Sequence, residues 1–396
     1  MIAPTLKQSE LFNEALDLLV TKVDQDEQTI GLEFPVVTGA SGAWRTMPAL
    51  NTRAYTGEGS FGNWFCGFWV GMLLASFLRS GRERFLEAAR KRMHLMVPHA
   101  DDRNTHDIGF NLCTSAPSAY YITGDTWFRD VGLHGANQLR SRLIATERNA
   151  FIPSWPLLHE QGSRTVQIDT MAVLPLLFWA AAESSDLSFG AAAEAHAKTT
   201  QQNFVRPDDS TGHAAEFDRV TGLATRKFTF RGYSDDSCWS RGQAWAIYGF
   251  VAAARATSKI EYLNLAERLC GHFLSRLDDT LIPFWDFDDS SNPNSPRDSS
   301  AAAVVASALL RLSSMHPDTE IGTKWRRHSF ALLEKLCEHC LARSTAHRGL
   351  LMHGCYRKPN NDGLDCASTY GDFYFVEALC EVCLPNGLAP TERSGL

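Results

Sequence analysis

The chain has 396 residues, of which 44% are hydrophobic and 21% are charged, a composition typical of a well-packed globular protein. Its net charge of −7 comes without any run of Lys and Arg, which argues against a nucleic-acid partner. The longest apolar runs, such as Met171–Ala182, are too short to span a bilayer. Residues 1–20 lack a basic segment followed by an apolar block. We therefore expect a cytoplasmic protein with no membrane partner.

Helical periodicity dominates the chain. Apolar residues recur at i, i+3, i+4 and i+7 in twelve windows, so we expect helices at residues 7–22, 63–80, 84–98, 109–123, 126–144, 169–184, 187–204, 238–255, 259–275, 298–314, 319–342 and 372–384. The even-numbered windows are apolar nearly all round, whereas the odd-numbered ones carry charges on one face. This alternation predicts an all-α ring of six helical hairpins with inner and outer layers. No linker divides it, so we expect one domain spanning residues 1–396.

Strand signals are few. Residues 212–229 contain alternating stretches and turn residues that can form a small hairpin. The turn-rich segment 31–54 resembles loops, within which Glu33–Val37 can form one short strand. No glycine-rich phosphate loop follows a strand, so a nucleotide-binding α/β fold has no support. An α-solenoid is the alternative architecture, but no self-similar repeat is visible.

Ten cysteines include two C-x-x-C pairs, Cys337/Cys340 and Cys380/Cys383. This pattern can indicate a four-thiolate zinc site. Both pairs lie inside expected helices, however, and not in the tight turns that zinc sites use. We therefore interpret them as buried, reduced thiols and expect no metal and no organic cofactor.

Six short polar or aromatic clusters each precede or begin an even-numbered helix. If every second helix of the ring points the same way, all six clusters meet at one end and build a single pocket. The clusters are Asn63-Trp64, His106-Asp107, Asp169, Trp239-Ser240-Arg241, Asp298-Ser299-Ser300 and Tyr370-Gly371-Asp372.

Two aspartates, Asp107 and Asp169, would lie at the starts of neighbouring inner helices. When two carboxyl groups face one cavity, desolvation and mutual repulsion raise one pKa and keep a proton available near neutral pH. Such a pair is typical of enzymes that act on sugars. The alternative is that each aspartate only caps its helix.

Other side chains of the clusters suit an anionic sugar. Trp64, Trp239 and Trp245 can form floors for sugar rings, although tryptophans such as Trp69 also fill cores. Arg241 suits a carboxylate, unless it forms an internal salt bridge with Asp235 or Asp236. His213 lies in a loop that can close over the pocket.

Five segments together resemble the unsaturated glucuronyl hydrolases, glycoside hydrolase family 88. The resemblance runs from about residue 60 to 385, and its most specific part is Trp239-Ser-Arg-Gly-Gln-Ala-Trp245. The segments are Thr105–Phe110, Gln167–Trp179, Gly232–Trp245, Asp298–Ala303 and Tyr370–Phe375.

The resemblance implies an (α/α)6 barrel that acts on oligosaccharides left by polysaccharide lyases. Such enzymes hydrate the C4=C5 vinyl ether of the non-reducing-end unsaturated uronic acid, and the product opens to release this sugar as a keto acid. By the family pattern, Asp169 is the general acid/base and Asp107 supports it. The positions of the substrate pocket are Trp64, His213, Trp239, Arg241 and Trp245.

Three departures from the family pattern bear on the substrate. Arg231 stands where well-known members have Gln in a pocket role, so an extra cation can face the substrate. Trp64-Phe-Cys-Gly-Phe-Trp69 lacks a polar group of the usual motif. Tyr356–Asp362 lacks the Ser-x-x-Ser-x-Lys pattern of members that accept sulfated fragments, although Arg357 and Lys358 can bind an anion differently. A conventional glycosidase on saturated uronides and a non-catalytic sugar-binding protein remain alternatives.

Overall fold

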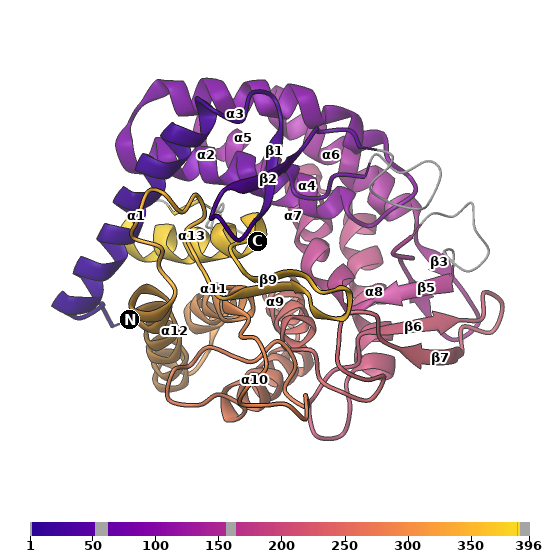
Figure 1. The fold of residues 1–396 in the computed structure, drawn as a ribbon. Helices are drawn as coiled ribbons and strands as arrows, with labels where there is room; N and C mark the ends of the chain where they lie inside the picture. Colours follow the sequence, from indigo (N-terminus) through magenta and orange to yellow (C-terminus); the bar gives the residue numbers. More distant parts are fainter. Residues whose placement is uncertain (1, 52–61, 156–163, 386, 389–396) are drawn as a thin grey trace.

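The computed structural model describes residues 2–51, 62–155, 164–385 and 387–388, and helices make up most of this part of the chain (Figure 1). The α-helices are α1 (Leu6–Glu27), α2 (Cys66–Ser80), α3 (Glu83–Met96), α4 (Ile108–Cys113), α5 (Ala116–Thr123), α6 (Thr126–Ser141), α7 (Leu174–Ser184), α8 (Leu187–Phe204), α9 (Ser240–Thr257), α10 (Ile260–Ser275), α11 (Ser299–Met315), α12 (Thr319–His339) and α13 (Thr369–Cys383). Three short 3-10 helices join them: η1 (Val97–Asp101), η3 (Ile168–Val173) and η4 (Lys358–Asn360).

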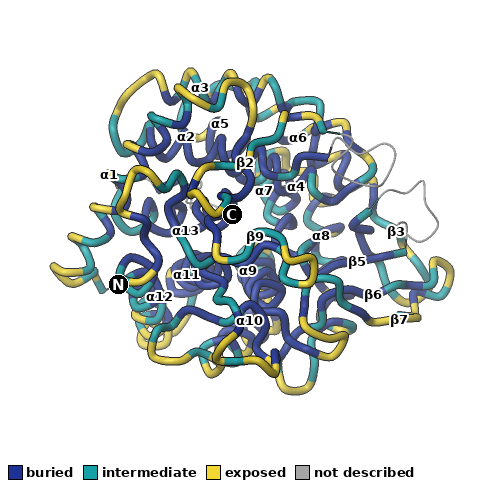
Figure 2. Tube along the Cα trace, viewed as in Figure 1, coloured by how far each residue is buried: buried dark blue, intermediate teal, exposed yellow. Residues whose placement is uncertain are grey.

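The helices form two layers, as the alternation of apolar and charged windows predicts. In α11, Arg311 is the one residue between Ser299 and Ser313 that is not buried, as expected for a helix inside the structure. In α3 the buried residues follow a single face, beginning Phe85, Ala89 and Met93. Figure 2 shows the same contrast between dark inner helices and outer helices with yellow stretches.

The inner helices close into a ring. Each packs on the next in the order α2, α4, α7, α9, α11 and α13, and α13 returns to pack on α2. The outer helices α1, α3, α6, α8, α10 and α12 each pack on at least one inner helix. The fold is therefore the (α/α)6 barrel that the sequence predicts.

Two of the expected helices differ from the prediction because of proline. The window 109–123 is two helices, since Pro117 lacks an N–H group and its ring opposes continuation of a helix from Cys113. The window 169–184 begins as the 3-10 helix η3, and α7 starts only at Leu174, directly before Pro175. Asp169 thus lies in a tight turn that leads into the helix.

Short strands connect the hairpins at their ends. The strands are β1 (Phe34–Thr38), β2 (Trp44–Met47), β3 (Ile144–Ala145), β4 (Ala150–Phe151), β5 (Thr165–Gln167), β6 (Ala214–Phe217), β7 (Ala224–Phe228), β8 (Gly354–Arg357) and β9 (Asp362–Cys366). The expected hairpin within 212–229 is confirmed as antiparallel β6 and β7, and the expected strand at Glu33–Val37 is confirmed as β1. The prediction missed β2–β5, β8 and β9, which are short and gain their order from pairing.

The connections carry the residues of the site to one end of the barrel. Strand β5 pairs with β6, which fixes the segment before Asp169 beside the segment after His213. Strand β8 packs on α11, and β1 contacts α2, α13 and β9. In the described residues, no helix is both long and apolar enough to cross a membrane.

Candidate active site

The six clusters lie at the amino-terminal ends of the inner helices, and contacts between their side chains join them. Trp64, just before α2, stacks on Tyr370 in the first turn of α13, with ring centroids 5.4 Å apart. Arg241 in α9 lies 5.0 Å from the Tyr370 ring and pairs with Asp298, the N-cap of α11. Four clusters therefore meet at one place.

The remaining two clusters join the same group through His106 and His213. His106 Nδ1 lies 2.6 Å from Thr170 Oγ1, which connects the start of α4 to η3. His213 Nε2 lies 3.9 Å from Asp169 Oδ2, and its ring centroid is 5.0 Å from that of Trp239. The convergence that the sequence predicts is confirmed.

Neither aspartate caps a helix. Asp107 occupies the N-cap position of α4 but its side chain makes no capping hydrogen bond. Asp169 lies inside η3, whose N-cap is Gln167 and also lacks a side-chain cap. The alternative that Asp169 only caps its helix is wrong, because the 3-10 turn moves the carboxylate away from the free N–H groups of α7. Both carboxylates are largely buried, with side chains 14% and 17% exposed.

The turn that carries Asp169 is held tightly between α4 and α9. A Cβ atom at Gly109 of α4 would lie 2.2 Å from the Val173 Cβ atom. A Cβ atom at Gly249 of α9 would lie 2.4 Å from the Met171 carbonyl oxygen. Such close approach is open only to glycine. Gly109 therefore lets α4, which begins after Asp107, pack against the turn that carries Asp169, and Gly249 lets α9 pack against the same turn.

The surroundings of Asp169 favour its protonated form. Burial raises the pKa of this carboxyl group above its ordinary value of 3.8, while Arg231 and then Arg241 act to lower it. Its Oδ2 atom is buried and has no hydrogen-bond partner among the described residues. A buried acceptor of this kind is costly unless a ligand or water satisfies it.

His213 is neutral and donates through Nε2. Burial, Arg231 and Arg241 together lower its pKa well below 6.5. The Phe230 N–H group lies 3.3 Å from Nδ1, which therefore accepts. The proton then resides on Nε2, which is buried, faces Asp169 and has no hydrogen-bond partner in the described part of the chain. His213 thus presents a donor beside an acid.

Asp107 lies beside groups that favour its negative charge. His106 Nε2 is 3.4 Å from its Oδ1 atom, and burial lowers the pKa of His106 to about 3, so this ring is neutral at pH 7. Arg142, which is buried, attracts Asp107 electrostatically. Arg142 also donates to the carbonyl oxygens of Pro153 and Trp155 and so fixes the chain beside the pocket.

The guanidinium group of Arg241 donates its hydrogen bonds to other groups of the protein. Its Nη1 donates to Asp298, Ser300 and the Cys355 carbonyl, and its Nη2 donates to the Tyr356 carbonyl. The internal salt bridge considered from the sequence is therefore present, but its partner is Asp298 and not Asp235 or Asp236. A direct contact of Arg241 with substrate stays a prediction.

The other predicted pocket residues differ in their access to a ligand. Trp64 is partly exposed above Tyr370, whereas Trp245 is 1% exposed and packs among Phe110 and Tyr374 below that layer. Trp239 is 4% exposed, and its ring contacts His213 and the Arg241 guanidinium. The guanidinium carbon lies 4.8 Å from the centroid of the Trp239 ring. Trp69 belongs to the core, as expected.

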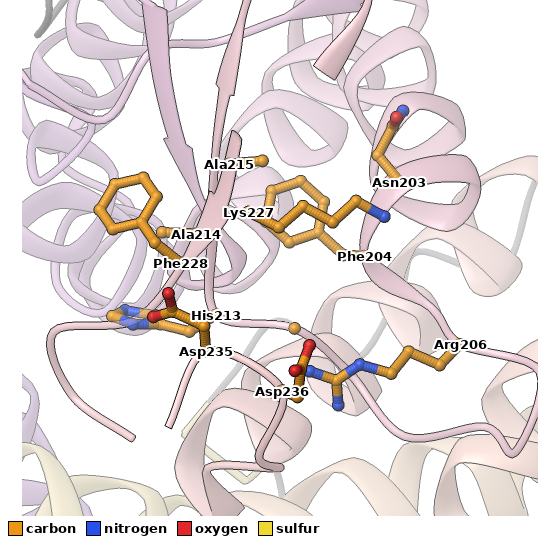
Figure 3. A pocket seen from close by; sticks show the side chains of 11 residues that line it. Asn203, Phe204, Arg206, His213, Ala214, Ala215, Lys227, Phe228, Asp235 and Asp236 are labelled. Atoms are coloured by element: carbon orange, nitrogen blue, oxygen red, sulfur yellow. The ribbon is translucent and has the colours of Figure 1, made fainter. Parts of the chain in front are cut away.

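A small pocket of about 40 Å³ lies beside His213 (Figure 3). This volume suits water and not a sugar ring. It is lined by Asn203, Phe204, Arg206, Gly212, His213, Ala214, Ala215, Lys227, Phe228, Asp235 and Asp236. This pocket is therefore a small cavity that shares His213 with the site, and it is not the place where a sugar binds.

No group of three His, Cys, Asp or Glu side chains in the described residues can hold a metal ion. Of the two C-x-x-C pairs, Cys337 lies in α12, Cys340 caps its carboxyl end, and Cys380 and Cys383 lie in α13. Burial raises the pKa of Cys337 and Cys340 to about 12, which keeps both as thiols.

Sequence reasoning missed one residue of the site and one of its ion pairs. Asp298 belongs to a predicted cluster, but its pairing with Arg241 was not predicted. Asp286, which is fully buried, accepts from the Tyr233 N–H and the Ser237 hydroxyl and so holds the loop after Arg231. The apolar sequence around Arg241 signals that the cation needs a buried partner, but no local pattern identifies which aspartate it is.

The chain is similar to curated enzymes over most of its length. It is 32% identical over 327 residues to the unsaturated glucuronyl hydrolase of Bacillus sp. (strain GL1), covering 80% of this chain and 85% of the relative. It is 29% identical to the unsaturated chondroitin disaccharide hydrolase of Streptococcus pneumoniae (strain ATCC BAA-255 / R6), covering 95% and 92%. No family model matches the chain.

Solved structures show the same barrel. An unsaturated glucuronyl hydrolase specific for heparin superposes with a TM-score of 0.84 at 29% identity, covering 94% of this chain and 97% of the other. The enzyme from Bacillus sp. GL1 gives 0.85 at 28% identity, covering 96% and 100%. From the relative of 32% identity and these shared folds, the chain belongs to the unsaturated glucuronyl hydrolase family, glycoside hydrolase family 88.

Proposed function

We propose that this enzyme hydrates the C4=C5 double bond of a 4,5-unsaturated uronic acid at the non-reducing end of lyase-generated oligosaccharides, with Asp169 as general acid and base. The observation that carries the proposal is the buried, unpaired Asp169 Oδ2 atom, whose pKa is raised by burial. A related unsaturated glucuronyl hydrolase variant of 28% identity has been solved with dGlcA-Glc-Rha-Glc, which supports this class of substrate.

The chemistry starts from the protonated form of Asp169, which the raised pKa of this carboxyl group favours. Asp169 donates the proton to C4, and the electron pair of the double bond forms the new C4–H bond. A water molecule adds at C5 and gives its proton to the carboxylate left on Asp169. The hemiketal formed at C5 opens, the ring oxygen stays on C1, and the C1 hemiacetal then expels the next sugar as an alcohol.

The neighbouring groups support each part of this sequence. His213 donates through Nε2 3.9 Å from Asp169 Oδ2, so it can orient the attacking water or a substrate hydroxyl. Asp107, across the junction of α4 and η3, can accept from sugar hydroxyls and stabilise positive charge that develops in the ring. Trp64 on Tyr370 provides an aromatic surface for the sugar.

Replacing Asp169 tests the proposal directly. Asp169→Asn preserves the shape of the residue but removes the proton donor, so we expect kcat to fall by at least about 10²-fold while oligosaccharide binding persists. Hydration is measured as the loss of ultraviolet absorbance of the conjugated double bond, and binding is measured by calorimetry. Asp101→Asn is the matched control, since Asp101 is 69% exposed outside the pocket. A near-normal rate for Asp169→Asn removes this residue from the mechanism, and turnover of saturated uronides alone refutes the hydration.

We also propose a cytoplasmic location. All ten cysteines are free, as expected in a reducing compartment. Fractionation of cells that express the protein tests this, and recovery outside the cytoplasm contradicts it.

A further inference from the structure

Two arginines face the catalytic acid, and they differ in what their nitrogen atoms do. Arg241 directs both terminal nitrogens to protein oxygens, including the carboxylate of Asp298. Arg231 Nη1 is buried and has no hydrogen-bond partner among the described residues. A buried guanidinium nitrogen without an acceptor is costly, so Arg231 has unused binding capacity that Arg241 lacks.

Contacts place Arg231 beside the reacting centre. Its guanidinium carbon lies 5.8 Å from the Phe230 ring and 5.3 Å from the Tyr356 ring. The Phe230 ring centroid is 4.3 Å from that of His213, whose Nε2 faces Asp169. Arg231 is also the cation with the larger electrostatic effect on Asp169. An anion bound between them would be adjacent to the bond that Asp169 protonates.

The backbone of Arg231 is fixed in advance. Its N–H group donates to Thr229 Oγ1 at 3.2 Å, and the following Gly232 N–H donates to the same oxygen at 2.7 Å. Two residues further on, the Tyr233 N–H donates to buried Asp286 at 2.8 Å. A group held in this way loses little entropy on binding, which favours an anchoring role.

We propose that Arg231 binds the carboxylate attached to C5 of the unsaturated ring, whereas Arg241 serves to hold the pocket walls together. The inference rests on the proposed function and names the anchor of that substrate. In the substrate the carboxylate is bonded to C5, next to the carbon that Asp169 protonates, so its anchor should be a cation close to this acid, as Arg231 is. Arg–carboxylate pairs are strong and directional.

A carboxylate bound to Arg231 would also change the pKa of Asp169. The groups that face Asp169 are Arg231 and Arg241 from the segment 231–241 and His213, which directly precedes β6. His106 and Asp107 directly precede α4, and His106 contacts Thr170, the neighbour of Asp169. Arg231 lowers the pKa of Asp169 in the free enzyme. A carboxylate bound to Arg231 offsets this cation, so the substrate itself strengthens the hold of Asp169 on its proton.

Arg231→Gln, measured with the unsaturated disaccharide and with its methyl ester, tests the inference. The wild-type enzyme should prefer the acid. In the variant we expect kcat/KM for the acid to fall about 100-fold and the value for the ester to change little, so that the preference disappears. Arg226→Gln is the matched control, because Arg226 lies in β7, five residues before Arg231 in the chain, and its side chain is 58% exposed.

A pH profile separates anchoring from a merely structural role. Because Asp169 acts in its protonated form, its deprotonation in the free enzyme sets the basic limb of kcat/KM. Loss of a nearby cation raises the pKa of Asp169 and should move this basic limb upward in pH for Arg231→Gln. An unchanged limb together with an unchanged preference for acid over ester overturns the inference.

Two further outcomes are distinct. If Arg231→Gln instead loses only the discrimination between sulfated and unsulfated disaccharides, Arg231 binds a sulfate on the adjacent sugar and our assignment is wrong. If the wild-type enzyme turns over no unsaturated disaccharide, the proposed function fails. In that case loss of binding of the unsaturated uronate in Arg231→Gln, measured by calorimetry, still decides the role of this residue.

Discussion

Thr229 organises two neighbours of the acid with one hydroxyl group. Its Oγ1 atom accepts from the N–H groups of Arg231 and Gly232 and lies 2.9 Å from His213 Nδ1. Because the two N–H groups occupy the lone pairs of the oxygen, its own O–H points to Nδ1. The histidine proton is thereby kept on Nε2, where it faces Asp169.

Substitution of Thr229 should therefore change catalysis more than stability. Thr229→Val keeps the shape and removes the nearer donor to Nδ1. Only the Phe230 N–H group at 3.3 Å then opposes the wrong tautomer of His213. We expect a 5- to 10-fold loss of kcat, since one hydrogen bond contributes about 1 kcal/mol. Thr229→Ser retains a hydroxyl and should restore most of the rate. Equal losses in both variants would show that the methyl group, and not the hydroxyl, is what matters.

At the scale of elements, η3 is the part of the barrel on which the site depends. It lies between Gly109 of α4 and Gly249 of α9, and neither glycine has room for a side chain. The distance between the backbones that carry Asp107 and Asp169 is thus set by the absence of one methyl group.

Gly109→Ala should impair both folding and activity. Its Cβ atom would meet Val173 Cβ at 2.2 Å, so α4 must move from η3, and we expect a loss of about 1–3 kcal/mol in the free energy of unfolding and a reduced kcat. Chemical denaturation and the absorbance assay measure the two effects. Gly271→Ala in α10 is the control: nothing lies within 4 Å of its added Cβ, so it should stabilise by about 0.5–1 kcal/mol. Normal activity and stability in Gly109→Ala would show that the junction is plastic.

For the whole molecule, buried titratable groups make stability depend on pH in opposing directions. Burial lowers the pKa of His196 and His106 to about 3, and burial raises the pKa of Asp372 to about 7. The two histidines bind protons more weakly in the native state than in the unfolded state, so they lower the free energy of unfolding as pH falls below about 6.5. Asp372 is protonated at a higher pH in the native state than in the unfolded state, so it raises the free energy of unfolding as pH falls.

His196→Asn isolates one of these contributions. His196 is fully buried in α8, and its Nδ1 accepts from the Ile152 N–H, an interaction that Asn can retain. The folded pKa lies below the unfolded one, so the wild type loses about 1.4 kcal/mol per pH unit at this site as pH falls below about 6.5. The difference in unfolding free energy between wild type and variant should therefore shrink from pH 7.5 to 5.5. A difference that is independent of pH would mean that His196 has the same pKa in the folded and unfolded states.

Sequence patterns were sufficient for the barrel but only partly for the site. All twelve helical windows contain helix, because periodicity over many residues averages out local exceptions, and the position of Asp169 at an inner-helix start followed from it. Whether that aspartate caps its helix depends on the 3-10 turn before Pro175. Hydrophobic periodicity does not predict such a local backbone conformation. The pairing of Arg241 with Asp298 and the unpaired nitrogen of Arg231 depend on residues far apart in sequence. That residues 1–396 form one domain stays a prediction.

The packing of α13 on α2 has a consequence for biosynthesis. The ring cannot close until Thr369–Cys383 has left the ribosome, long after Cys66–Ser80. Until then α2 lacks its neighbour on one side, and Trp64 lacks the tyrosine on which it stacks. The nascent chain therefore exposes part of the apolar helix α2 through most of translation. The active site can be complete only after α13 has been synthesised.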